Sequence, residues 1–142
     1  MSPYRVVFDT NVIITALRSR NGASYRLLSL LGDPRFTPCV SVPLVLEYED
    51  VAKRKQGELG LSGEEIDDVL DYLCSVADRR EIFYLWRPFL KDPKDDMVLE
   101  LAVEAGCRSI VTYNGSDFAG VEQFGIEAIT PKQFLQQIGE IP

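Results

Sequence analysis

The sequence predicts an α/β protein in which a mostly parallel sheet is covered by helices on both faces. Short β-branched apolar runs alternate along the chain with longer segments of helical periodicity, and this alternation favours parallel strand pairing. The first apolar run, residues 4–9, ends on a carboxylate, and a helical pattern begins almost at once. A strand that ends in this way brings its last side chain to the edge where open α/β sheets bind ligands.

Composition and charge restrict the class of protein. The chain has 142 residues, which fits one domain with a sizeable core, so we expect a single domain over residues 1–142. No apolar run approaches the roughly 20 residues that cross a bilayer, and no signal-peptide pattern is present, so we expect a cytoplasmic protein without membrane contact. The net charge of -7 argues against a broadly basic surface, although not against nucleic acid as a substrate.

Two residue types limit the possible chemistry. The sequence has no histidine, which removes His-based triads, His general bases and most zinc sites. Cys39, Cys74 and Cys107 are widely spaced in apolar surroundings, so we expect free thiols. Catalysis must therefore use carboxylates, hydroxyls, amides, lysine, arginine or a metal ion.

The expected strands are apolar runs bounded by turn residues, at 4–9, 36–41, 82–85, 108–112 and 126–129. The expected helices have apolar residues at helical spacing, at 12–18, 23–31, 43–55, 62–77, 95–105 and 131–138. Thr10 or Asn11 is a plausible cap of the first helix, and Pro43 lies in a first turn, where a missing N–H is harmless. Ser62 and Glu65 form a capping-box pattern, and residues 56–60 predict a loop.

Four acidic residues occupy positions that predict an inward-facing carboxylate. Asp9 and Asp117 follow the ends of apolar strands. Glu47 lies on the apolar stripe of the helix 43–55, and Asp95 lies on the apolar side of its own helix. Carboxylates in such surroundings repel one another unless a cation lies among them, so together they predict a metal-dependent enzyme, and a nuclease in particular.

Each acid also has a purely structural explanation. Asp9 fits a helix N-cap, although Thr10 or Asn11 would serve equally well, and Asp117 fits the cap of a short helix. Glu47 fits a salt bridge with a nearby arginine, and Asp95 fits the favourable position of an acid in a first helical turn. The conjunction of the four residues carries the metal-site hypothesis.

The segments around these acids resemble the motifs of the PIN-domain family, in particular its VapC-like toxin components of toxin–antitoxin pairs. The similar segments, in order, are residues 7–13, 41–47, 92–102, 110–118 and 129–135. The resemblance covers nearly the whole chain. It implies a three-layer α/β/α sandwich and a ribonuclease that depends on Mg²⁺ or Mn²⁺.

The resemblance also implies roles for individual residues. Metal ligation and catalysis would fall to Asp9, Glu47, Asp95 and Asp117. Supporting polar groups would be Asn11, Thr112 and Asn114, with Asp96 as a neighbour of Asp95. Many relatives have an acid where Asn114 stands, which leaves the tightness of a second metal site open. RNA is the implied substrate, and an antitoxin protein and a homodimer are the implied assemblies.

Two other functions fit parts of the pattern. A haloacid-dehalogenase-like phosphohydrolase also begins with a strand that ends in Asp, but it needs a second Asp where Asn11 stands. A catalytically weak PIN-fold binding module would show lost acids, and Asn114 is one such position.

Substrate guidance would need local positive charge and aromatic rings. The cations near the first acidic motif are Arg18, Arg20 and Arg26, and the basic run is 53–55. The aromatic residues suited to base stacking are Tyr25, Tyr113 and Trp86. A solvated face is the simpler explanation for the cations, and core packing is the simpler explanation for each aromatic residue.

Overall fold

The computed structural model describes residues 3–82 and 89–142 and contains a parallel sheet with the strand order β3-β2-β1-β4-β5. The strands are β1 (Tyr4–Phe8), β2 (Phe36–Ser41), β3 (Asp78–Arg80), β4 (Ser109–Val111) and β5 (Glu127–Ile129). β1 is the central strand, and its Val6 pairs with Pro38 on one side and Ser109 on the other. The predicted fold class is confirmed.

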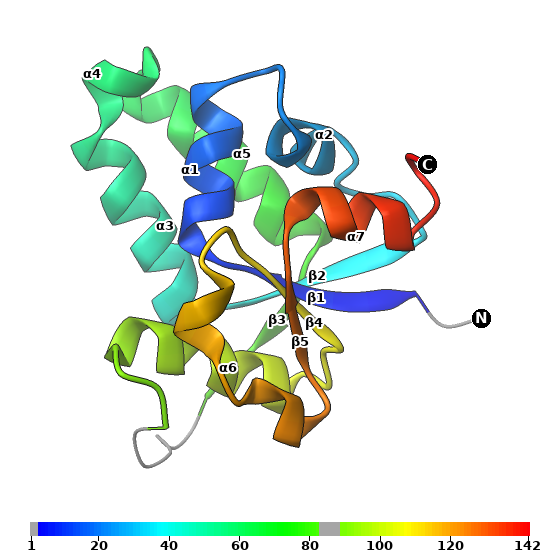
Figure 1. The fold of residues 1–142 in the computed structure, drawn as a ribbon. Helices are drawn as coiled ribbons and strands as arrows, with labels where there is room; N and C mark the ends of the chain where they lie inside the picture. The colour runs from blue at the N-terminus through cyan, green and yellow to red at the C-terminus, as the bar shows by residue number, and fades with distance from the viewer. Residues whose placement is uncertain (1–2, 83–88) are drawn as a thin grey trace.

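Helices cover both faces of this sheet. They are α1 (Thr10–Arg18), α2 (Ala23–Ser29), α3 (Val42–Arg54), α4 (Gln56–Leu59), α5 (Gly63–Val76), α6 (Pro93–Glu104) and α7 (Pro131–Gln137), with short 3-10 helices η1 (Gly115–Phe118) and η2 (Val121–Phe124). α6 packs against β1, β2 and β4 on one face, and α1, α2 and α7 lie on the other (Figure 1). Among the described residues, every helix is too short or too polar to traverse a bilayer.

The core fills the space between these layers. Val6 and Val7 are completely buried in β1, as expected for a central strand that is covered on both faces. Phe36 meets Phe8 and Phe134 edge-to-face, with ring centroids 6.3 and 5.5 Å apart. These aromatic contacts fix α7 against β1 and β2.

The expected elements and the observed ones differ mainly in short polar segments. Residues 56–60, expected as a loop, contain the helical turn α4, which ends at Leu59 and is capped by Gly60 with a left-handed φ of 68°. The third strand is Asp78–Arg80, and its polar sequence carries no strand pattern. The strand expected at 82–85 lies outside the described residues except for Ile82, which is not in a strand.

Candidate active site

Asp9 lies where β1 passes into α1 and is only 9% exposed. Its backbone N–H continues the sheet by donating to the Val111 carbonyl at 2.9 Å. Its Oδ1 accepts a hydrogen bond from the Thr10 backbone N–H at 2.8 Å and so caps α1. The expectation that Thr10 or Asn11 would cap this helix is therefore wrong, because α1 begins one residue after Asp9.

The Thr112 hydroxyl fixes the second oxygen of Asp9. Thr112 is buried directly after β4, and its Oγ1 donates to Asp9 Oδ2 at 2.8 Å. The same Oγ1 accepts from the Asn114 backbone N–H at 3.0 Å and, more weakly, from Asn11 Nδ2 at 3.5 Å. Since N–H donors occupy its acceptor side, the hydroxyl proton must point at Asp9, which favours the ionised carboxylate.

Asn11 and Asn114 support the site in different ways. Asn11 Oδ1 accepts from the Tyr113 backbone N–H at 3.3 Å, so its side chain joins α1 to the segment that follows β4. Asn114 contributes its backbone N–H to Thr112, and its side chain is exposed without a hydrogen bond to other described residues. Asn114 thus helps to orient Asp9 only through its main chain.

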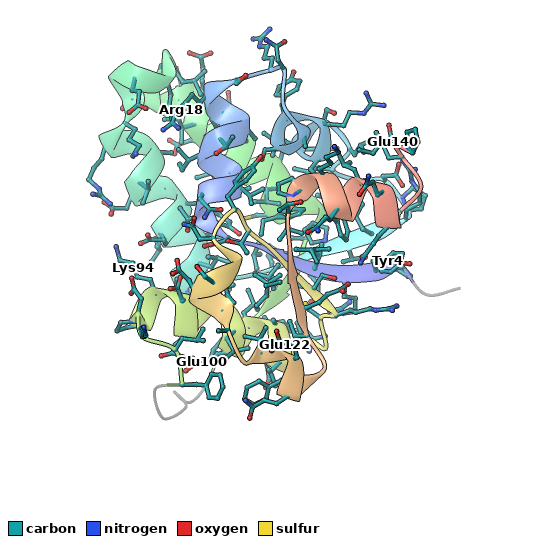
Figure 2. All side chains as sticks on the ribbon, viewed as in Figure 1. Tyr4, Arg18, Lys94, Glu100, Glu122 and Glu140 are labelled. Atoms are coloured by element: carbon teal, nitrogen blue, oxygen red, sulfur yellow. The ribbon has the colours of Figure 1, made fainter. Side chains whose placement is uncertain are left out.

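α3 brings Glu47 and Tyr48 to the same edge of the sheet. Tyr48 is completely buried, and its hydroxyl donates to the Phe8 carbonyl, immediately before Asp9. The Glu47 side chain is 18% exposed, and its Oε1 lies 3.7 Å from Lys94 Nζ. Figure 2 shows Lys94 at the outer side of α6. This long pair to an exposed lysine holds Glu47 weakly, so the carboxylate remains available.

α6 supplies Asp95 and Asp96, which have separate tasks. Asp96 Oδ1 accepts the backbone N–H groups of Phe89 and Leu90 at 3.2 and 2.8 Å, so it anchors the residues before α6. Asp95 is half-buried, and its side chain has no hydrogen bond or ion pair with another described residue. Burial first, then the charges of Asp9 and Asp117, raise the pKa of Asp95 to about 6.

The same mutual repulsion acts on Asp9. Burial is the largest cause that raises the pKa of Asp9, and the charges of Asp117 and Glu47 raise it further. The hydrogen bonds from Thr112 and Thr10 oppose this shift. Asp117 itself is exposed within η1. The four acids singled out from the sequence therefore act on one another at one edge of the sheet.

The donor set fits a hard divalent cation, although the carboxylates stand apart. Within residues 3–82 and 89–142, no three acidic, histidine or cysteine side chains are arranged to hold a metal ion as they stand. The available donors near Asp9 and Asp95 are all oxygens, which Mg²⁺ and Mn²⁺ prefer, and their repulsion would be relieved by positive charge. Binding would require the side chains to draw together.

Most of the expected guiding cations are occupied within the protein. Arg18 pairs with Glu58, Lys53 with Asp67 and Glu49, and Arg54 with Asp50. Because of these pairs, Lys53 and Arg54 are not free to contact a substrate. Lys55 is the remaining cation of the basic run. Trp86 lies outside the described residues.

One contact near the site has no signal in the sequence. Ser24, almost completely buried in α2, hydrogen-bonds through its hydroxyl to the hydroxyl of Tyr113. Ser24 and Tyr113 are 89 residues apart, and only the packing of α2 beside the segment after β4 brings them together.

Comparison with known proteins identifies the family. Residues 5–116 match the family model described as PIN domain, and the chain belongs to the PIN-domain family. Proteins with this domain are generally nucleases and typically use divalent metal ions. No curated protein matches the chain.

A solved structure supports the fold independently. The chain is similar to the crystal structure of VapBC2 from Rickettsia felis, which was solved bound to a DNA fragment from its promoter. The TM-score is 0.59 and the sequence identity is 14%. The match covers 89% of this chain and 98% of that chain. The three-layer arrangement around a parallel sheet is therefore shared despite the low identity.

Proposed function

We propose that this protein is a ribonuclease that depends on Mg²⁺ or Mn²⁺ and hydrolyses RNA phosphodiesters. The observation that carries the proposal is the mutual electrostatic effect of Asp9, Glu47, Asp95 and Asp117 at one sheet edge. Acids that raise the pKa values of their neighbours destabilise the folded state, and acids with shifted pKa values are concentrated at functional sites.

The residues that would hold the principal ion are Asp9, Asp95 and Asp117, with Glu47 holding a second ion or orienting water. When bound, the ion would lower the pKa of water and stabilise negative charge on the phosphate during in-line displacement. Asp9 keeps about two of its four lone-pair positions free, because Thr10 and Thr112 use one on each oxygen. Thr112 orients this carboxylate and favours its charged form.

The biological role follows the family subgroup that the sequence resembles. We propose a cytoplasmic toxin component of a toxin–antitoxin pair, in which the antitoxin places a basic side chain among the acids. The low-identity likeness to VapBC2 is compatible with this role through the fold. Homodimerisation is a further proposal from the same resemblance.

A cleavage assay tests the enzymatic proposal. Mixed RNA incubated with Mn²⁺ or Mg²⁺ should be cut, and EDTA should prevent the cut. Asp9→Asn should lower the rate at least a hundredfold while the fold persists, because Asn caps a helix as well as Asp does. The matched control is Asp68→Asn, which removes an exposed acid on α5 and should leave the rate unchanged.

Two results would contradict the proposal. Undiminished cleavage by Asp9→Asn would show that the activity arises elsewhere. Failure of the wild-type protein to bind Mn²⁺ by calorimetry, together with no cleavage, would favour the binding-module alternative.

A further inference from the structure

A basic groove lies between α2 and α7. Its volume is about 520 Å³, and residues 20–22, Tyr25, Arg26 and Lys132 contribute to its lining. Three cations in one groove are notable in a chain with a net charge of -7. Local positive charge of this kind concentrates anions near a surface.

Two of these three cations lack an anionic partner among the described residues. Arg26 pairs with Glu140, which Figure 2 shows beyond the end of α7. Arg20 and Lys132 are both exposed, and neither forms an ion pair with the described part of the chain. By contrast, Arg18 and residues 53–54 are neutralised by neighbouring acids. The groove therefore offers two cations to an external anion.

Tyr113 connects this groove with the acidic site. Its hydroxyl is held by Ser24, the neighbour of the groove residue Ala23, and its backbone N–H is held by Asn11. Despite these two hydrogen bonds, Tyr113 is 44% exposed. Thr112, which orients Asp9, directly precedes it. Tyr113 is thus an exposed aromatic residue that is bonded to α2 beside the groove and adjoins the residue that orients Asp9.

We infer that the α2–α7 groove and Tyr113 bind a single-stranded nucleic acid as it leaves the acidic site. Arg20 and Lys132 contact backbone phosphates, and a base stacks on the exposed ring of Tyr113. A single strand is required because duplex bases have their faces covered by neighbouring bases. An acidic peptide would satisfy the cations but would not use the ring. The inference rests on the proposed nuclease function, for which it names the form of the substrate.

The test is equilibrium binding in EDTA, which separates binding from cleavage. The probe is a short fluorescein-labelled single-stranded oligoribonucleotide, measured by fluorescence anisotropy across a range of salt concentrations. The double substitution Arg20→Gln with Lys132→Gln should weaken binding about tenfold at low salt. It should also reduce the slope of log K against log salt by about 1.4, because two phosphate contacts are lost. Arg108→Gln is the matched control, because Arg108 is an exposed cation that directly precedes β4, at the opposite end of this strand from Thr112, and it should change neither quantity.

Tyr113 is tested by two substitutions. Tyr113→Ala should weaken binding about tenfold through lost stacking, whereas Tyr113→Phe keeps the ring and should bind almost as well as the wild type. A 2-aminopurine base in the oligoribonucleotide should lose fluorescence on binding to Tyr113→Phe but not to Tyr113→Ala. A structural role of the hydroxyl alone would instead make both variants equally weak.

The outcomes distinguish this inference from the proposed function. An unchanged salt slope in the double variant, a loss as large in Arg108→Gln, or binding of polyglutamate in place of RNA would overturn the groove assignment. If the wild type cleaves RNA and Asp9→Asn does not, these results leave the nuclease proposal intact. If the groove binds RNA as expected but no cleavage occurs with Mn²⁺, the groove assignment is kept and the proposed nuclease function fails.

Discussion

Asp95 is the acid whose ionisation has the clearest consequence for stability. In the folded protein, burial and the charges of Asp9 and Asp117 raise its pKa from 3.8 to about 6. The folded state therefore binds this proton more tightly than the unfolded chain does. Stability falls as pH rises from about 4 to about 6, and the destabilisation is complete above that range.

We predict that Asp95→Asn stabilises the metal-free protein at neutral pH. After allowance for solvent screening the gain should be about 1 kcal/mol, which corresponds to about 2–4 °C in Tm. The gain should shrink towards pH 4, because the wild-type carboxyl is then protonated and uncharged in the folded state. Thermal denaturation in EDTA at pH 7.5 and 4.5 measures both effects. An equal gain at the two pH values would contradict the electrostatic explanation.

At the scale of elements, α3 is hydrogen-bonded to the end of the central strand β1. Tyr48 donates its hydroxyl to the Phe8 carbonyl from a completely buried position. Tyr72 on α5 makes a comparable bond to the Leu31 carbonyl at 3.0 Å but is 52% exposed. Water can replace the second bond but not the first, so the two tyrosines should differ in their energetic importance.

We predict that Tyr48→Phe costs about 1–3 kcal/mol of unfolding free energy, because it leaves a buried carbonyl without its donor. Tyr72→Phe should cost less than about 1 kcal/mol. Urea denaturation measures both variants. Tyr48→Phe should also slow RNA cleavage, since Phe8 precedes Asp9, whereas Tyr72→Phe should not. Equal effects of the two substitutions would show that burial does not decide the outcome.

The sequence predicts those elements whose signals are local. β2 has the expected bounds, and both hydrogen bonds of the capping box between Ser62 and Glu65 form, at 3.0 and 3.1 Å. β3 was not predicted, because its polar residues are stabilised by pairing with β2 and by the bond between Arg5 and Asp78. Its strand character arises from a neighbour and not from its own pattern.

Prediction of the site from the sequence has the same limit. Spacing and strand ends were enough to single out Asp9, Glu47, Asp95 and Asp117, and their metal-binding role stays a prediction. The Thr112 hydrogen bonds and the groove beside Lys132 depend on which distant segments meet. No local sequence pattern indicates that α7 packs beside α2, so Lys132 could not be predicted from the sequence as part of a binding groove.

The whole molecule carries a net charge of -7, and several of its acids face one another at one sheet edge. Self-repulsion of this kind destabilises a compact state. A ligand that binds only the folded state stabilises it by mass action. A divalent cation should therefore act on stability as well as on activity.

We predict that Mg²⁺ or Mn²⁺ at about a hundred times its Kd stabilises the protein by about 2.7 kcal/mol, or about 5–10 °C in Tm. NaCl of equal ionic strength should have a much smaller effect. Asp9→Asn should lose most of the divalent response, and Asp68→Asn should keep it. Differential scanning fluorimetry measures these shifts. An identical response of the two variants would indicate general screening instead of a site.

The hydrogen bond between Thr112 and Asp9 joins residues that are 103 positions apart. During translation, Asp9 emerges long before the hydroxyl that orients it, and Asp117 emerges later still. A growing chain on the ribosome therefore lacks an assembled carboxylate cluster until residues 112 and 117 have been made. Under the proposed function, a nascent chain cannot cut the message that is being translated before those residues have been added.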